Sequence, residues 1–419
     1  MRHKFLLGLF LTIIYNISFS QTAVDSLLSV GNTYYKKNDF VKAAQTWERA
    51  AQITENKLAR NTNYSYAAFA YASAKDSSNS FKCLDIAITQ LGFNDLPALN
   101  SEDAFLFMKE SSRWKNLLNS IKPVYTKNPK AVNVIDKDVL NFWKAYDIVQ
   151  SNPSMAEKIY METYINNGTM ALQFYYLNKI DNIKNFVYIH NLKKKYYNSI
   201  RTNTLKAATL KSTFQKSFIN LKNLYPEAIF PPIYFVVGKL NSAGTISSEG
   251  LILGIDQACM SPTADTTELN AWEKKNISTF KNLPYTVAHE LIHFEQSGMA
   301  SDTTLLAAAL KEGMADFIGE LISGKTANER LKIFVKGKEK SIWTDFKKEM
   351  YLARAYNWIA NSEQETANKP ADLGYWVGYQ ICKSYYDQAT DKKKAIYEML
   401  HIQDYKKFLE ESKLDEKFQ

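Results

Sequence analysis

The sequence predicts an α+β protein in which a helical N-terminal region precedes a domain that combines a small sheet with helices. Three observations lead to this fold class. Residues 22–121 show helical periodicity, residues 231–238 and 249–258 are rich in strand-forming side chains, and only helical patterns follow them. Because strands and helices are segregated along the chain, a small antiparallel or mixed sheet is favoured over an alternating parallel α/β sheet.

The composition is that of a globular protein with a sizeable core. The chain has 419 residues, of which 46% are hydrophobic and 23% are charged, so two or three domains are expected. The formal net charge is +9, but the longest basic runs are three lysines at residues 193–195 and 392–394. Such scattered charge is typical of a lysine-rich surface, and we expect no nucleic-acid partner.

The first residues have the pattern of a secretory signal peptide. A basic start is followed by an apolar run at residues 5–14, and Ser18 and Ser20 are small residues ahead of a predicted cleavage before Gln21. The run is too short to span a bilayer, and no cysteine follows it, so neither a stable membrane span nor a lipid anchor is expected. We therefore predict signal peptide 1–20 and an exported protein, periplasmic or extracellular. An uncleaved membrane anchor is the alternative.

Residues 22–121 are predicted to form a short helical array. Residues 27–53 contain two helical patterns separated by a polar break, with Gly31 and Ala43 small where the helices would cross. A second copy aligns at residues 66–93, and a partial third covers residues 98–121. These segments resemble tetratricopeptide repeats. The resemblance implies either a partner-binding surface or a structural cap, and residues 122–134 are expected to be a linker.

The domain expected at residues 135–419 begins with helices and continues into the two strand-like segments. The polar segment 239–248 is expected to be a loop joining them in a hairpin. The second of these strands, residues 249–258, is a candidate sheet edge that could pair with an extended peptide.

The segment PYTVAHELIHFEQ, residues 284–296, carries the clearest chemical pattern. Pro284 suits the first turn of a helix, which places His289 and His293, four residues apart, on one face. In this H-E-x-x-H pattern the two histidines bind zinc and Glu290 acts as the general base.

A second predicted helix supplies the remaining groups. Ser301 or Asp302 is expected to cap it, and Gly324 to end it. Within it, Glu312 is the expected third ligand of one Zn²⁺ per chain. Asp316, one turn later, is expected to accept a hydrogen bond from a zinc-bound imidazole.

H-E-x-x-H, 18 residues and then E-G-x-A resembles the gluzincin metallopeptidases, and the wider stretch 135–400 is similar to a bacterial family of predicted zinc-dependent proteases. The resemblance implies a zincin-like metallopeptidase domain, with a small antiparallel or mixed sheet and active-site helices. The Gly-x-Met-Glu-Asn segment of the group's aminopeptidases is absent from the sequence, which argues against that subgroup.

The function that these patterns predict is an exported zinc peptidase acting on a peptide or protein substrate. Glu290 would take the proton of a zinc-bound water, and Tyr375 or Tyr379 would stabilise the oxyanion, unless these tyrosines are core residues. Two alternatives stay open. One is a tetratricopeptide-type adaptor with a non-catalytic zinc, and the other is a zinc hydrolase of a non-peptide amide.

Overall fold

A computed structural model describes residues 19–121, 124–366 and 368–418 of the chain. The chain divides into two compact units, Met1–Lys122 and Pro123–Gln419. The predicted signal peptide lies outside the described residues, except for Phe19 and Ser20, which begin the first helix.

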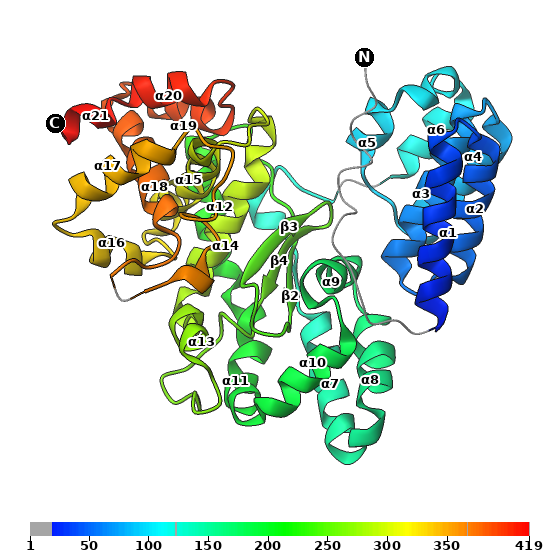
Figure 1. Cartoon of the computed structure of the whole chain (residues 1–419), viewed down its shortest axis with the longest axis horizontal. Coiled ribbons are helices and arrows are strands. Elements are labelled where there is room, and N and C mark those ends of the chain that lie inside the picture. Colours follow the sequence, from blue (N-terminus) through cyan, green and yellow to red (C-terminus); the bar gives the residue numbers. More distant parts are fainter. Residues whose placement is uncertain (1–18, 122–123, 367, 419) are drawn as a thin grey trace. The chain divides into compact units, whose positions relative to one another are not determined.

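The first unit is built from helices joined by short loops, and the α-helices are α1 (Phe19–Lys36), α2 (Phe40–Ile53), α3 (Lys57–Ser73), α4 (Ser77–Asp85), α5 (Leu96–Ser101) and α6 (Ser112–Ser120) (Figure 1). Asp39 and Asp76 accept hydrogen bonds from the first turns of α2 and α4, which fixes where these helices begin. A Cβ atom on Gly31 would lie 2.4 Å from Nε1 of Trp47, so α1 and α2 approach closely at the glycine that the sequence singled out.

The second unit contains the sheet and most of the helices. Its strands are β1 (Val134–Ile135), β2 (Ile233–Val236), β3 (Gly244–Ser247) and β4 (Gly250–Gly254). Its α-helices are α7 (Lys137–Ser151), α8 (Ala156–Ile159), α9 (Met170–Tyr175), α10 (Ile183–Leu192), α11 (Lys194–Lys206), α12 (Lys211–Leu224), α13 (Ala271–Asn276), α14 (Leu283–Glu295), α15 (Leu305–Ser323), α16 (Glu329–Val335), α17 (Glu339–Glu349), α18 (Leu373–Gln388), α19 (Lys392–Leu400), α20 (Tyr405–Ser412) and α21 (Leu414–Lys417).

Part of the segment expected to be a linker belongs to this second unit. Thr126 forms an isolated bridge with Phe230, and Val134 opens β1, which pairs with β2. Backbone hydrogen bonds therefore join Thr126 to Phe230 and Asn133 to Ile233 of β2, and the division between the units falls at residues 122 and 123.

The sheet has four strands in the order β1-β2-β4-β3 and is mixed. β2 runs parallel to β1 and β4, and β3 is antiparallel to β4. The predicted hairpin between residues 231–238 and 249–258 is therefore wrong, because the polar segment between them contains β3, and β3 makes the hairpin with β4. The expected edge position of residues 249–258 is also wrong, since β4 lies inside the sheet and β3 is at its edge.

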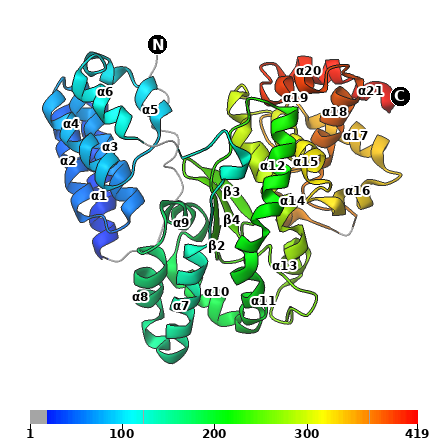
Figure 2. The same ribbon diagram turned by 180° about the vertical axis from the view of Figure 1, so that it is seen from behind.

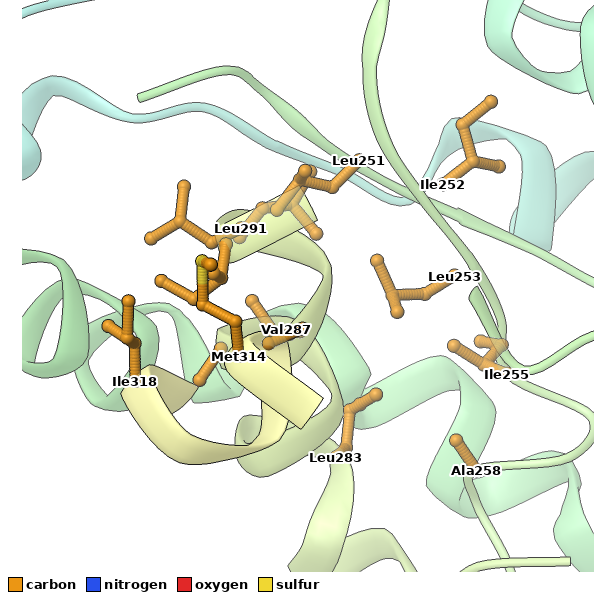
Figure 3. Packing of buried hydrophobic residues seen from close by; sticks show 14 of the residues in the cluster. Leu251, Ile252, Leu253, Ile255, Ala258, Leu283, Val287, Leu291, Met314 and Ile318 are labelled. Atoms are coloured by element: carbon orange, nitrogen blue, oxygen red, sulfur yellow. The ribbon is translucent and has the colours of Figure 1, made fainter. Parts of the chain in front are cut away.

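Helices cover both faces of the sheet. α7 and α9 pack against β2 on one side, whereas α14 packs against β3 and β4 on the other (Figures 1 and 2). In β4, Leu251 and Leu253 point towards α14, and Ile252 points the opposite way, as strand alternation requires (Figure 3). Val287 of α14 and Met314 of α15 lie in the same buried cluster, so the helices that carry the candidate site rest on the sheet core.

The predicted α+β class is confirmed, because the described chain is mostly helical with one small mixed sheet. Cys83, Cys259 and Cys382 are buried free thiols. Within the described residues, no helix is both long enough and apolar enough to cross a membrane.

Candidate metal centre

Two helices, α14 and α15, carry the candidate site. Pro284 lies in the first turn of α14, as predicted. α15 begins after Thr304, whose side chain accepts a hydrogen bond from the backbone N–H of Ala307, so the predicted cap at Ser301 or Asp302 is wrong. Gly324 ends α15 in a left-handed conformation with φ 91°, as predicted.

Glycines set the distance between α15 and its neighbours. A Cβ atom on Gly319 would lie 3.4 Å from the backbone nitrogen of His289, so α15 passes the first histidine of α14 at van der Waals distance. A Cβ atom on Gly313 would lie 2.1 Å from the backbone nitrogen of Tyr379. Gly313 therefore allows close packing of α15 on α18, whereas Gly319 faces α14.

The three predicted ligands come together between α14 and α15. The Nε2 atoms of His289 and His293 are 3.0 Å apart. Oε2 of Glu312 lies 3.1 Å from Nε2 of His293 and 3.6 Å from Nε2 of His289. Each of these three side chains offers one ligand atom. The three atoms lie within 4.8 Å of one another, close enough to bind a single metal ion.

The other ring nitrogen of each histidine faces an oxygen acceptor. Nδ1 of His289 lies 2.9 Å from Oδ1 of Asp316, the arrangement that the sequence predicted for this aspartate. Nδ1 of His293 lies 2.8 Å from Oε1 of Gln296. Each ring is therefore oriented with Nε2 towards the shared centre.

Burial and charge oppose each other in this cluster. Burial alone would lower the pKa of His289, but hydrogen bonds to Asp316 and Glu312 raise it well above its usual value. Burial would raise the pKa of Glu312, but the charges of His293 and His289 and their hydrogen bonds hold it well below its usual value. These surroundings thus favour positive charge on His289 and negative charge on Glu312.

Glu290 is buried beside the three ligands. Burial raises its pKa, and the neighbouring histidines His293 and His289 oppose that rise. Gly244 of the edge strand β3 makes room for this side chain, because a Cβ atom there would lie 2.3 Å from Oε1 of Glu290. A larger residue at position 244 would therefore displace Glu290.

The two candidate tyrosines occupy different surroundings. The ring of Tyr375 stacks on that of His289, with centroids 6.1 Å apart and planes at 10°. Burial, then the charges of Glu312 and Asp372 and a hydrogen bond to Glu312, raise the pKa of Tyr375 well above its usual value. Tyr379 instead packs edge-on against Phe317 and lies under the ammonium group of Lys332. Tyr375 is thus the tyrosine beside the cluster.

Three residues of the site were missed by the sequence reasoning. Gln296 follows His293 by three residues, a spacing that could have suggested a contact at the end of α14. Asn328 donates hydrogen bonds to both carboxylate oxygens of Asp316, at 3.0 and 2.8 Å, from a loop that carries no motif. Gly244 lies in a segment that was expected to be a loop.

The fold and the cluster together define an α+β protein with a candidate metal centre on two adjacent helices. A protein-family model described as "Gliding motility protein GldB" matches residues 126–415, which is more than half of the chain. The chain therefore belongs to the family of gliding motility protein GldB. No curated protein and no solved structure matches it.

This match corrects the functional prediction. Membership of a gluzincin-type protease family is wrong, because the matching family is one of gliding motility proteins. The family match therefore also contradicts the predicted peptidase activity and its peptide substrate. It supports neither the adaptor nor the amide-hydrolase alternative. The catalytic roles of Glu290, Tyr375 and Tyr379 lose the activity on which they rested. The family match also does not extend over the first unit, so the tetratricopeptide resemblance gains no support from it.

Proposed function

We propose that this chain is an exported component of gliding motility and that its second unit binds one Zn²⁺ ion through His289, His293 and Glu312. The motility role rests on the family of gliding motility protein GldB. The metal role rests on one observation, the convergence of two imidazole nitrogens and one carboxylate oxygen on a single point.

The ring orientation makes that convergence chemically specific. Oδ1 of Asp316 and Oε1 of Gln296 accept hydrogen bonds, so the Nδ1 atoms that face them carry the protons. In the neutral form that binds metals, each Nε2 atom then presents a lone pair to the other across 3.0 Å. When neither Nε2 carries a proton, these two lone pairs and the carboxylate oxygen repel one another, and a metal cation between them removes that repulsion.

Charge balance supports the same proposal. Glu290, Glu312 and Asp316 bring three carboxylates into a largely buried region. Buried ionised carboxylates need compensating charge, and a divalent cation supplies it where they meet. A bound ion would also link α14 to α15 through side chains from both helices.

The ligand set suits zinc. Imidazole nitrogen and carboxylate oxygen are ligands that Zn²⁺ accepts in roughly tetrahedral sites, and three protein ligands leave its fourth position to another group. Other divalent transition metals share these preferences. Which metal is bound then depends on the geometry of the site and on the availability of each metal. A binding test must therefore compare zinc with manganese, cobalt and nickel.

Metal analysis of the mature protein tests the metal role. We expect about one equivalent of zinc after dialysis against a zinc buffer, and a rise in thermal stability on zinc binding. At a free zinc concentration about 100 times Kd the gain is about 2.7 kcal/mol. Protein that binds no divalent metal and gains no stability from any of them would contradict this part of the proposal.

The motility role needs a separate test in cells. Deleting the coding sequence in the host should reduce gliding on a surface, and restoring the wild-type chain should recover it. Fractionation should find the mature chain outside the cytoplasm, in the periplasm or at the cell exterior. Unchanged gliding in the deletion strain, or a cytoplasmic chain, would overturn that half of the proposal.

A partner surface on the first unit is part of the same proposal. The helices of residues 19–121 lie outside the family match and form a unit of their own. We propose that this unit binds a protein partner. Removing residues 22–121 should then abolish rescue of gliding while leaving zinc binding by the second unit intact. Full rescue by the truncated chain would rule out an essential partner there.

A further inference from the structure

We infer that Gln296 and Asn328 are positioning residues that hold the two histidines in the orientation needed for metal binding. The inference rests on the proposed zinc function and adds the groups that fix which ring nitrogen faces the ion. Neither residue touches the point where the ligand atoms converge. Each acts through a hydrogen bond to another side chain.

The first arrangement fixes His293. Nε2 of Gln296 donates a hydrogen bond to the backbone carbonyl of Lys311 at 2.7 Å. A carbonyl oxygen only accepts, so the amide cannot be turned round, and Oε1 must face His293. That oxygen accepts from Nδ1 of His293 at 2.8 Å, which leaves Nε2 free to bind a metal.

The orientation of Gln296 is secured by its place in the fold. It is buried and lies in the short 3₁₀ turn Gln296–Gly298 directly after α14. Its partner Lys311 belongs to α15, next to the ligand Glu312. One amide therefore connects the end of the helix that supplies two ligands to the helix that supplies the third.

The second arrangement fixes His289. Asn328 donates from Nδ2 to both oxygens of Asp316, and Oδ1 of Asp316 accepts from Nδ1 of His289 at 2.9 Å. Asp316 is 4% exposed, so its orientation depends on these partners more than on water. Asn328 thus limits the rotation of the carboxylate that orients the ring.

The two arrangements differ in charge, and this difference makes them separable. A carboxylate holds His289, whereas a neutral amide holds His293. Gln296 contacts its histidine directly, whereas Asn328 acts through Asp316. We therefore expect loss of Gln296 to weaken zinc binding more than loss of Asn328. Removing outer hydrogen-bond partners of metal ligands typically weakens binding about 10–100-fold.

The test combines zinc affinity with proton NMR of the imidazole groups in the zinc-loaded full chain. Wild type should show slowly exchanging Nδ1–H signals for His289 and His293. Gln296→Leu should bind zinc about 10–100-fold more weakly and lose the protected signal of His293 alone.

Asn328→Leu provides an independent variant on the other histidine, and it carries the test if Gln296→Leu does not fold. It should weaken zinc binding by up to about tenfold and speed exchange of the Nδ1–H of His289 only. Gln45→Leu, at an exposed glutamine on α2, is the matched control and should change neither readout. The Nδ1–H signals of His190 and His401, which face backbone carbonyls, serve as internal references.

The outcomes separate this inference from the proposed function. Wild-type zinc affinity together with a protected His293 signal in Gln296→Leu would overturn the role of Gln296 while leaving the metal site standing. The same pair of results for His289 in Asn328→Leu would overturn the role of Asn328. Wild-type protein that binds no zinc would overturn the proposed function, and this inference with it.

Discussion

Two buried histidine environments in the second unit lead to opposite electrostatic results. His190 lies among the rings of Phe142, Tyr160, Phe186 and Tyr197. Its Nδ1 faces the carbonyl of Phe186, but its buried Nε2 has no hydrogen-bond partner among the described residues. Burial lowers its pKa to about 3, so His190 is neutral near pH 7.

In His289 and His293 on α14, each Nδ1 also faces an oxygen acceptor. These two histidines differ from His190 in what surrounds Nε2. There, Glu312 contributes an oxygen 3.1 Å from His293, and each histidine faces the other. Burial in an aromatic cluster favours a neutral ring. Burial beside carboxylates instead favours positive charge next to them, carried either by a protonated ring or by a bound metal ion. The comparison shows that surroundings, rather than burial alone, mark the candidate metal centre.

Removing a ligand should give the largest effect. His293→Ala deletes a nitrogen at the centre of the cluster, and we expect zinc affinity to fall by more than about 100-fold, beyond the usual effect of an outer partner. The matched control is His401→Ala, because His401 lies outside the cluster and its Nδ1 faces the backbone carbonyl of Tyr397. Competition with a chelator measures both variants. Equal affinities for the two variants would break the distinction between the cluster and other histidines.

Removing the carboxylate behind His289 should give a smaller effect. Asp316→Ala deletes the acceptor of Nδ1 but leaves all three ligands in place, so we expect zinc binding about 10–100-fold weaker than wild type. Calorimetric titration of zinc into the metal-free protein gives the affinity. An unchanged value would mean that Asp316 does not orient the histidine.

The dependence of stability on pH tests whether the surroundings of His190 hold its ring neutral. Its pKa is about 3 in the folded chain and about 6.5 when unfolded, so between these values the unfolded state binds more protons. Its contribution to stability is complete above about pH 6.5 and falls by about 1.4 kcal/mol per pH unit on acidification, until about pH 3.

The variant His190→Phe keeps an aromatic ring in the cluster and cannot be protonated. Its free energy of unfolding in urea should therefore fall less steeply than that of wild type between pH 6.5 and pH 4, by up to about 1.4 kcal/mol per pH unit. Other titrating groups are common to both chains and cancel in the difference. Parallel curves would show that His190 is not held neutral by its surroundings.

The sequence could predict those parts of the site that depend on local helical geometry. The i, i+4 spacing aligns His289 with His293, and the same spacing places Asp316 one turn from Glu312. The α+β class could also be predicted, since strand-like and helical segments are segregated along the chain.

The rest depends on contacts that local pattern does not encode. β3 is a short edge strand in a polar segment, and it exists because β4 offers it a pairing partner. Thr304 displaces Ser301 and Asp302 as the cap of α15, although all three residue types can cap a helix. Asn328 reaches Asp316 across 12 residues from a loop.

The functional class of the protein is likewise not encoded in a local sequence pattern. A zinc-binding pattern describes a few side chains on two helices, whereas the family relationship is carried by residues 126–415. The pattern therefore supports the metal proposal, whereas the family match supports the motility role.

X-ray absorption at the zinc edge, measured on the zinc-loaded wild-type chain, is the most direct test of the proposed zinc centre. We expect two imidazole nitrogens at about 2.0–2.1 Å and at least one oxygen at about 2.0–2.2 Å from the zinc. His293→Ala should lose one imidazole contribution, whereas His401→Ala should retain both. A spectrum with sulfur at about 2.3 Å, or with no imidazole contribution, would contradict a zinc centre formed by His289, His293 and Glu312.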